Sequence, residues 1–310
     1  MRVYVMGSGG LVGRALLSQA PSKHEIFQTS RNELDLRDRL LVEKYIVKNE
    51  IDSVILAAAK VGGIYANSVH QKEFLLENLK IQNSVIEASV NAGVENFIFL
   101  GSSCIYPKLA QQPITEESIL TGSLEKTNEG YALAKIAGVR LCQSVYDEEG
   151  RNFFSLMPTN LYGPNDCYHN LNSHVPAALM RRFHEGKIFG SKEISIWGTG
   201  NVYREFMHAF DLAAACWFFL EQDVGGELIN VGTGSDISIR KFAELMAEVV
   251  GYRGKLTFDD SKPDGALRKL LDISKAKSLG WEASIPLVDG LAATYNWFSD
   301  AYSRGEIRGL

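Results

Sequence analysis

The sequence predicts an α/β fold in which a doubly wound parallel sheet carries a smaller α/β lobe. In the first half of the chain, short apolar runs alternate with helix-like stretches, which is the pattern of βαβ units. After Pro158 the composition changes: Asn160–Ser173 is rich in Asn, Gly, Tyr and His, which is typical of an ordered loop. The length of 310 residues fits two domains, or one core with a second lobe.

The predicted elements follow this alternation in order. Short apolar runs predict buried strands, and longer amphipathic stretches predict helices. In the first half, the predicted strands are Arg2–Met6, Glu25–Thr29, Asp52–Ala58, Asn96–Gly101 and Phe153–Met157. The first predicted helix follows the first strand and its glycine-rich turn and ends at about Gln19. The other predicted helices of this half are Leu36–Asn49, Glu73–Asn91 and Tyr131–Tyr146. Beyond Pro158 we expect helices at about His174–Glu185, Arg240–Val250 and Leu287–Phe298, and strands at Ile194–Trp197 and Glu227–Val231.

Composition excludes several classes of protein. The 32 basic and 37 acidic residues give a net charge of −5, which argues against a nucleic-acid partner. The longest apolar stretches, such as Asp211–Leu220, are shorter than the ~20 residues that span a bilayer, so no membrane partner is expected. No signal peptide is visible before the first strand. The four cysteines form no CxxC pair, and we therefore expect reduced thiols in a cytoplasmic protein without a metal site.

A glycine-rich turn follows the first predicted strand directly. The glycines of Gly7-x-x-Gly10-x-x-Gly13 would let backbone N–H groups approach a pyrophosphate, which the N-terminus of the next helix stabilises. A tight strand–helix turn without a ligand is the alternative. The position of the turn favours a dinucleotide site and a Rossmann-type sheet.

The end of the second predicted strand indicates which dinucleotide is bound. A free ribose 2′-hydroxyl usually meets Asp or Glu at this place, whereas a 2′-phosphate favours Arg. Here the chain has Thr29-Ser30-Arg31, so the sequence favours NADP over NAD. A solvated loop arginine is the alternative interpretation of Arg31.

Three further residues point to carbonyl chemistry. Tyr131 and Lys135 are four apart in a predicted helix and therefore share one face. A nearby ammonium favours a phenolate and should bring the pKa of Tyr131 toward the working range. Ser102 follows the fourth strand, at the sheet edge where ligands bind, and its hydroxyl can bond the same carbonyl oxygen as Tyr131. Turn or capping chemistry is the alternative for Ser102 and Ser103.

These features predict how the chain is divided. Residues 1–165 should form an NADP-binding Rossmann domain, which is rejoined by about 207–235. Residues 166–206 and 236–310 should form the substrate-binding lobe. Since no Ser/Pro-rich hinge separates them, both parts are expected to contribute to one cleft.

Longer segments resemble a known family. The chain resembles the extended short-chain dehydrogenase/reductase superfamily, and the finer match is to the GDP-L-fucose synthase family. GxxGxxG and YxxxK occur throughout the superfamily, whereas AAAKVGGI and SSCIYPK are narrower signals. The segments that carry the resemblance are Ala57–Ile64, Leu100–Lys108, Tyr131–Gly138, Met157–Pro164, Asn172–Val175, Arg181–Glu185 and Lys262–Asp272.

The resemblance implies a role for each matching residue. The reductive triad matches Ser102, Tyr131 and Lys135, and the epimerisation pair matches Cys104 and His174. The GDP-sugar contacts of the family fall on Arg182, Trp197, Arg204 and Asp264. The expected NADP contacts are Gly7, Ser8, Gly9, Gly10, Leu11, Val12, Gly13, Arg31, Leu100, Gly101, Ser102, Lys135, Pro158, Thr159, Asn160, Leu161 and His174.

The expected activity is a two-stage conversion of GDP-4-keto-6-deoxy-D-mannose to GDP-L-fucose. The ketone acidifies the protons at C3 and C5, which Cys104 as base and His174 as acid would exchange, since Cys and His titrate closest to neutrality. Tyr131 and Ser102 would stabilise the enolate oxygen. NADPH would then deliver hydride to C4 while Tyr131 donates the proton. The resemblance also implies a homodimer built on the helices Glu73–Asn91 and Tyr131–Tyr146.

The chain departs from the family pattern at two places, and two alternatives to the expected activity remain. Many family members carry Arg where this chain has Gly9, which weakens the expected NADP selectivity, and the loop Asn165–Leu171 is not a close match. Another GDP-4-keto sugar, a colitose or 6-deoxyheptose precursor, is therefore an alternative substrate. A non-catalytic NADP-binding regulator is the alternative from a different class, but it has no need for Ser102, Tyr131 and Lys135 together.

Overall fold

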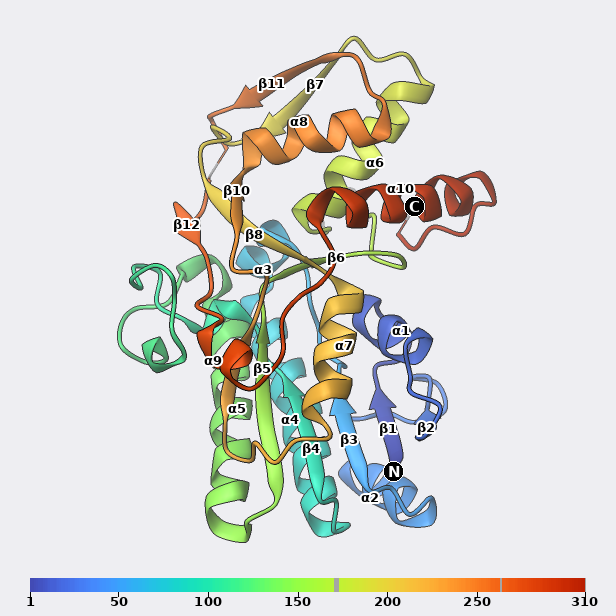
Figure 1. The fold of residues 1–310 in the computed structure, drawn as a ribbon, viewed down its shortest axis with the longest axis vertical. Helices are drawn as coiled ribbons and strands as arrows, with labels where there is room; N and C mark the ends of the chain where they lie inside the picture. The colour runs from blue at the N-terminus through green and yellow to red at the C-terminus, as the bar shows by residue number, and fades with distance from the viewer. Residues whose placement is uncertain (170–172, 263, 310) are drawn as a thin grey trace.

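A six-stranded parallel sheet forms the centre of the molecule, with the strand order β2-β1-β3-β4-β5-β9 (Figure 1). The computed structural model describes residues 1–169, 173–262 and 264–309. The strands of this sheet are β1 (Arg2–Met6), β2 (Glu25–Gln28), β3 (Ser53–Leu56), β4 (Asn96–Leu100), β5 (Asn152–Pro158) and β9 (Leu228–Val231). Their apolar runs match the burial of both faces that a covered parallel sheet requires.

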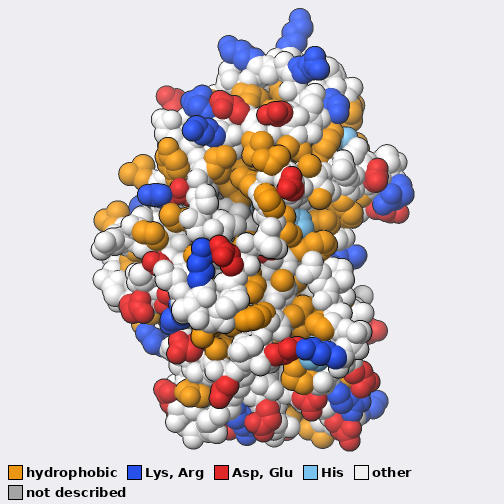
Figure 2. Space-filling model, viewed as in Figure 1, with side chains coloured by type: hydrophobic (Ala, Val, Ile, Leu, Met, Phe, Trp, Pro, Cys, Tyr) orange, Lys and Arg blue, Asp and Glu red, His pale blue; other side chains and the backbone are white. Residues whose placement is uncertain are grey.

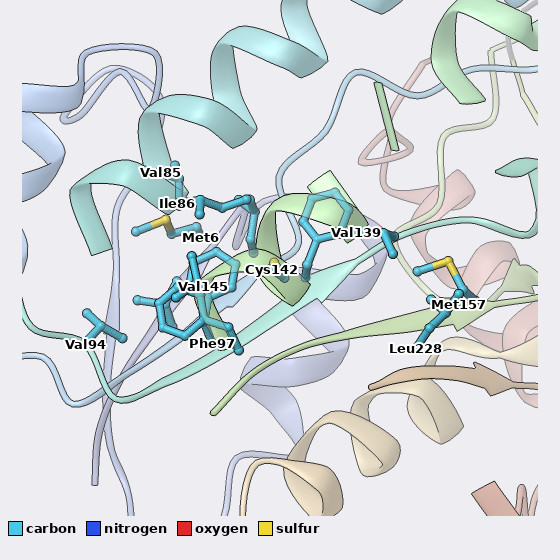
Figure 3. Packing of buried hydrophobic residues seen from close by; sticks show 14 of the residues in the cluster. Met6, Val85, Ile86, Val94, Phe97, Val139, Cys142, Val145, Met157 and Leu228 are labelled. Carbon is cyan, nitrogen blue, oxygen red and sulfur yellow. The ribbon is translucent and has the colours of Figure 1, made fainter. Parts of the chain in front are cut away.

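Helices cover both faces of this sheet. Along β1, Tyr4 and Met6 enter one hydrophobic core while Val3 and Val5 enter the other, because successive strand residues point to opposite faces. The first core packs under α2 (Arg39–Lys48), α4 (Gln71–Asn91) and α5 (Glu129–Glu149), and Figure 3 shows Val85 and Ile86 of α4 and Val139, Cys142 and Val145 of α5 near Phe97 of β4. The second packs under α1 (Leu11–Ser18) and α7 (Ala209–Phe219).

A smaller lobe lies beyond the carboxyl ends of the strands, in the upper part of Figure 1. Its own hydrophobic core joins three helices to β7 and β8. The lobe contains α6 (Val175–Ile188), α8 (Ile239–Val250), α10 (Leu287–Ser303) and the parallel pair β7 (Glu193–Trp197) and β11 (Lys255–Asp259). β8 (Tyr203–His208) pairs with β10 (Asp236–Ser238), β12 (Arg268–Lys269) and β6 (Asn160–Tyr162).

The predicted α/β fold is confirmed, with corrections to individual elements. Part of the expected loop Asn160–Ser173 is the strand β6, whose Tyr162 pairs with His208; residues 170–172 lie outside the described residues. The apolar stretch Asp211–Leu220 largely belongs to α7, which was not expected as a helix. The structure also adds β8, β10, β11 and β12, the short helices α3 (Ile64–Val69) and α9 (Ser274–Ser278), and the 3-10 turns 103–105, 116–118 and 126–128.

Acidic and basic side chains are interspersed on the face that Figure 2 shows. They concentrate at the two ends of the molecule, and hydrophobic side chains occupy much of the band between them. Among the described residues, no helix combines the length and the apolar character that crossing a membrane requires.

Candidate active site

The glycine-rich turn lies where the order of the strands reverses. β1 has β2 on one side and β3 on the other, and the crevice at such a point binds ligands in open α/β sheets. Gly7 has φ +95, and a Cβ there would lie 2.6 Å from the backbone nitrogen of Ala58. A Cβ on Gly13 would lie 2.2 Å from the carbonyl oxygen of Gly7, whereas one on Gly9 would meet nothing within 4 Å. Glycine is therefore required at positions 7 and 13 but not at position 9.

Helix α1 directs its N-terminus at this turn. Gly10 is the N-cap residue and provides no side-chain cap, and the first turn of α1 contains no acidic residue. The first N–H groups of the helix, on Leu11 and Val12, therefore keep their capacity to bind an anion. This cradle fits a dinucleotide pyrophosphate.

The end of β2 lies against the same turn. The Ser8 hydroxyl donates a hydrogen bond to the Thr29 carbonyl oxygen over 3.4 Å. Arg31, two residues further on, is exposed and forms no salt bridge within the described part of the chain. Arg37, by contrast, is held by Asp35 and Glu77. Arg31 is thus the cation of this edge that remains available to a ligand phosphate.

Ser102, Cys104 and Tyr131 come together at the carboxyl end of β4. Ser102 caps the 3-10 turn 103–105, and its Oγ accepts a hydrogen bond from the Cys104 backbone N–H over 3.4 Å. Tyr131 lies in the first turn of α5, with the Ser102 side chain close enough to its phenol to lower the phenol pKa. Phe74 of α4 packs edge-on against the Tyr131 ring, with the ring centroids 6.4 Å apart. These contacts hold the phenol and the serine hydroxyl side by side.

Lys135 lies one turn further along α5 and is only 3% exposed. Its Nζ donates a hydrogen bond to the Leu100 carbonyl oxygen at 2.7 Å and stands over the Phe99 and Tyr131 rings, 4.6 and 5.8 Å from their centroids. Burial lowers the pKa of Lys135 to about 8. A Cβ on Gly138 would come within 2.3 Å of the Phe99 ring, so this glycine lets α5 approach β4 closely.

The expected effect of Lys135 on Tyr131 is not observed. Burial, and next the nearby Cys104, raise the pKa of the Tyr131 phenol above its ordinary value, and only the hydrogen bond with Ser102 opposes them. Burial of the phenol accounts for most of the rise, and the Lys135 Nζ is bonded to the Leu100 carbonyl oxygen rather than to the phenol oxygen. Tyr131 is therefore an acid that carries its proton at neutral pH.

Cys104 is 6% exposed, and burial raises the pKa of its thiol. Four contributions lower this pKa, the largest from Lys269, followed by Ser102, Lys135 and the backbone of Cys104 itself. Lys269 belongs to β12, where it pairs with Arg204 of β8. Burial lowers the pKa of Lys269, and the interaction with Cys104 raises it. The thiol therefore lies in a buried environment with two ammonium groups nearby.

His174 stands apart from this group. It is exposed and occupies the N-cap position of α6, without a side-chain cap. Among the described residues, no hydrogen bond, ion pair or ring contact joins it to Cys104 or Tyr131, and its charge instead acts on the buried carboxyl of Asp166. The structure therefore does not bring the expected epimerisation pair into contact.

The four residues expected to bind the GDP-sugar lie in the smaller lobe. Asp264 accepts hydrogen bonds from the Thr199 backbone and hydroxyl, each at 2.8 Å, and the Arg204 Nη2 donates to the Asp264 carbonyl oxygen over 3.2 Å. Trp197 ends β7, is 53% exposed and has Lys262 over its ring. The Arg182 guanidinium donates to the Ser195 carbonyl oxygen of β7. Burial lowers the pKa of both arginines, so both are partly desolvated cations.

The segment expected to contact the cofactor after β5 leads directly into β6. Pro158 and Thr159 are buried, and Asn160 and Leu161 are half-buried. The Asn160 side chain donates to the Glu205 carbonyl oxygen over 2.8 Å. The segment thus connects the sheet edge to β8 of the lobe.

Comparison with known proteins fits this arrangement. Residues 3–232 match the model of the NAD dependent epimerase/dehydratase family. The chain belongs to this family. Within the family, the chain is 50% identical to GDP-L-fucose synthase 1 of Arabidopsis thaliana, over 96% of this chain and 93% of that protein. It is 46% identical to GDP-L-fucose synthase of Escherichia coli K12, over 98% of both chains. The predicted resemblance is thereby confirmed.

A solved structure extends the comparison to the cofactor. The GDP-mannoheptose C4 reductase of Campylobacter jejuni with NADP bound superimposes with a TM-score of 0.88. The two chains are 35% identical in sequence, and the match covers 96% of this chain and 98% of the reductase.

Sequence reasoning missed two charged residues at the candidate site. Lys269 lies near Cys104 although 165 positions separate them. Asp166 is buried next to the charge of His174. Lys269 lies within Lys262–Asp272, one of the segments that carry the family resemblance. Nothing in that segment predicted that Lys269 would lie near the Cys104 thiol. No pattern in the sequence distinguished Asp166 from an ordinary loop carboxylate.

Proposed function

We propose that the chain is a bifunctional 3,5-epimerase and 4-reductase that converts GDP-4-keto-6-deoxy-D-mannose to GDP-L-fucose with NADPH. The observation that carries the proposal is the convergence of Ser102, Cys104 and Tyr131 at the end of β4. The hydroxyl groups of Ser102 and Tyr131 can both bond to the ketone oxygen of the substrate, and the Cys104 thiol lies beside them. The relatives named GDP-L-fucose synthase, at 46% and 50% identity, support this substrate.

NADP fits the glycine cradle, where Gly7 and Gly13 leave room and the N-terminus of α1 can meet the pyrophosphate. Arg31 is placed to bind the ribose 2′-phosphate. Lys135 is placed to bind the nicotinamide ribose, since it is buried beside Tyr131. When bound, NADPH supplies the hydride that reduces C4.

The reductive half of the reaction uses a protonated phenol. Because burial raises the pKa of Tyr131, the phenol keeps its proton until negative charge develops on the ketone oxygen. Ser102 donates a second hydrogen bond to this oxygen and stabilises it as an oxyanion-hole donor does. The Lys135 Nζ, 5.8 Å from the centre of the Tyr131 ring, would lie beside the phenolate that proton donation leaves behind.

The epimerising half uses Cys104 as the base and His174 as the acid. The Cys104 thiolate takes a proton from C3 or C5, and the electron pair moves to the ketone oxygen between Ser102 and Tyr131. His174 then donates a proton to the opposite face of the same carbon. Lys269 supports this step because its ammonium lowers the pKa of the thiol.

The lobe holds the nucleotide part of the substrate. Arg182 and Arg204 are suited to bidentate pyrophosphate contacts, and the exposed Trp197 ring can stack on an apolar face. Asp264 shapes this region, since its carboxylate holds the Gly198–Thr199 turn.

Turnover of defined GDP-4-keto sugars tests the function. The purified protein should oxidise NADPH in the presence of GDP-4-keto-6-deoxy-D-mannose and release GDP-L-fucose, identified by NMR. The structural likeness to a GDP-mannoheptose C4 reductase makes a GDP-4-keto heptose the comparison substrate. A tenfold higher kcat/KM for the heptose would contradict the proposed substrate. No turnover with either sugar would favour a non-catalytic regulator.

The proposal includes the division of the chain. Residues 1–165 with 207–235 would bind NADP, and residues 166–206 with 236–310 would bind the sugar nucleotide. The pairing of β9 with β5 supports the return of the chain to the sheet, and the separate core around α6, α8 and α10 supports the lobe.

We also propose a homodimer formed through α4 and α5, in a reducing compartment such as the cytoplasm. Exposed Leu76 on α4 and Leu133 on α5 support an interface on these helices. Four free cysteines support the compartment.

A further inference from the structure

Asp166 carries a buried carboxylate oxygen that the described residues leave unpaired. The residue lies in the loop between β6 and α6 and is 6% exposed. Its Oδ1 accepts a hydrogen bond from the Cys167 backbone N–H over 2.7 Å. Its Oδ2 is buried and has no hydrogen-bond partner within the described part of the chain. Because a buried, unpaired carboxylate oxygen is costly, this atom requires a partner in the working protein.

Two cations and one phenol act on this carboxyl. Burial raises the pKa of Asp166, and the charges of His174 and Arg308 lower it. Tyr168 lies close enough for Asp166 to raise the pKa of its phenol. Arg308 is exposed in the C-terminal segment, where its backbone carbonyl accepts a hydrogen bond from the Tyr168 N–H. Of the two cations that lower the Asp166 pKa, His174 is the one that belongs to the proposed chemistry. We therefore consider His174 as the partner of Asp166 Oδ2.

We propose that Asp166 is a positioning residue whose Oδ2 accepts a hydrogen bond from one ring nitrogen of His174. The proposal rests on the proposed function and deepens it. A buried carboxylate that binds one imidazole nitrogen fixes the tautomer and the orientation of the ring, and leaves the other nitrogen for the substrate. The exposed ring then has one side facing protein and the other facing the sugar. Apo structures often show such bonds open, and they tighten when substrate binds.

The pairing explains why the acid and the base of epimerisation lie apart in the structure. Cys104 is fixed by the end of β4, whereas His174 precedes α6 in the other lobe. An acid and a base on opposite faces of one sugar carbon can come from different elements. Asp166 would keep the His174 ring directed while the sugar fills the space between the two groups.

The tautomer of His174 tests the pairing without any substrate turnover. In 15N-histidine-labelled protein, long-range 1H–15N spectra show which ring nitrogen carries the proton, and His174→Gln assigns the signal among the six histidines. With GDP bound, the wild type should show one dominant tautomer. Asp166→Asn should give a mixture or the opposite tautomer, and the matched control Arg308→Gln should leave the signal unchanged. An unchanged signal in Asp166→Asn would overturn the proposal.

A double-mutant cycle tests the consequence for proton transfer. Deuterium wash-in from D2O at C3 and C5, measured with NADP+ in place of NADPH, isolates epimerisation from reduction. Asp166→Asn should lower kcat for wash-in roughly tenfold to hundredfold, with KM within twofold. The double variant Asp166→Asn/His174→Gln should be no slower than His174→Gln alone, because Asp166 acts through His174. Additive losses would overturn the positioning role. Wild-type wash-in by His174→Gln would refute the proposed function of His174 and leave the tautomer result to decide the pairing.

Discussion

Burial moves the pKa values of Tyr131 and Lys135 in opposite directions. The phenol becomes harder to deprotonate and the ammonium easier, because in both cases desolvation disfavours the charged form. Both residues lie on one face of α5, at the place where β4 ends. The YxxxK spacing predicted this contact, but the direction of the shift at Tyr131 depends on Phe74 and on other residues distant in sequence.

Removal of the phenol hydroxyl should abolish most of the reduction. We expect Tyr131→Phe to lower kcat for NADPH oxidation by about 10²–10⁴-fold, the usual contribution of a positioned acid. The ring still packs against Phe74, so the unfolding midpoint in urea should stay close to that of the wild type. The exposed Tyr65→Phe serves as the control. Activity of Tyr131→Phe within tenfold of the wild type would remove Tyr131 from the mechanism.

The lowered pKa of Lys135 predicts the pH dependence of reduction. Below about pH 8 the ammonium is protonated and can stabilise the Tyr131 phenolate; above it the amine is neutral and the support is lost. The rate should therefore fall as the pH rises through about 8. A pH profile of kcat/KM for NADPH oxidation measures this. A profile that stays level to pH 10 would show that the charge of Lys135 is not required.

Lys269 should make the Cys104 thiol more acidic. Since its ammonium favours the thiolate, Lys269→Met should raise the pKa of Cys104 and slow its alkylation by iodoacetamide at pH 8. Mass spectrometry of the Cys104 peptide gives the rate at this residue as a function of pH. Arg268→Gln is the matched control, because Arg268 pairs with Asp236. An unchanged alkylation profile in Lys269→Met would contradict the role.

At the scale of elements, the sequence predicts the parallel sheet well and the lobe poorly. Five of the six strands of the sheet are largely apolar and buried, so their sequences indicate strands covered on both faces, whereas the edge strand β2 is only partly buried. α7 was missed because it is apolar on nearly all sides, so it has no helical periodicity to detect. β10 and β12 have three and two residues, and their pairing with β8 depends on segments far along the chain. For the same reason, motifs located Ser102, Tyr131 and Lys135, whereas the contact of Lys269 with Cys104 was not predictable.

The strand–helix turn provides a matched pair of variants. A Cβ at position 13 would overlap the Gly7 backbone, whereas a Cβ at position 9 has open space. We expect Gly13→Ala to weaken NADPH binding at least tenfold and to destabilise the fold by about 1–3 kcal/mol. Gly9→Ala should change neither the affinity for NADPH nor the stability of the fold. Fluorescence titration with NADPH and urea unfolding measure both effects. Equal behaviour of the two variants would contradict the proposed cradle.

At the scale of the whole molecule, one carboxylate joins the sheet to the lobe. Glu205 of β8 is fully buried, and it accepts hydrogen bonds from the backbone N–H groups of Thr233, Gly234 and Leu271. Thr233 and Gly234 follow β9 of the sheet, and Leu271 follows β12 of the lobe. Buried hydrogen bonds to Glu205 therefore connect the lobe to the end of the sheet.

The proposed dimer depends on apolar surface that α4 and α5 leave exposed. Leu133→Glu should dissociate the dimer, because a charge in an interface loses its solvation. Sedimentation velocity at micromolar concentration measures the oligomeric state. Leu40→Glu places the same charge on exposed α2 and should leave the dimer intact. A wild-type protein that sediments as a monomer would refute the interface.

The buried phenol of Tyr131 also has a consequence for the reverse reaction. To run backwards, the reaction needs a base that removes the hydroxyl proton of the finished sugar, and the phenolate form of this side chain can do so. Desolvation keeps that form scarce near neutrality. Oxidation of the product should therefore be slow in neutral buffer and accelerate in alkaline solution.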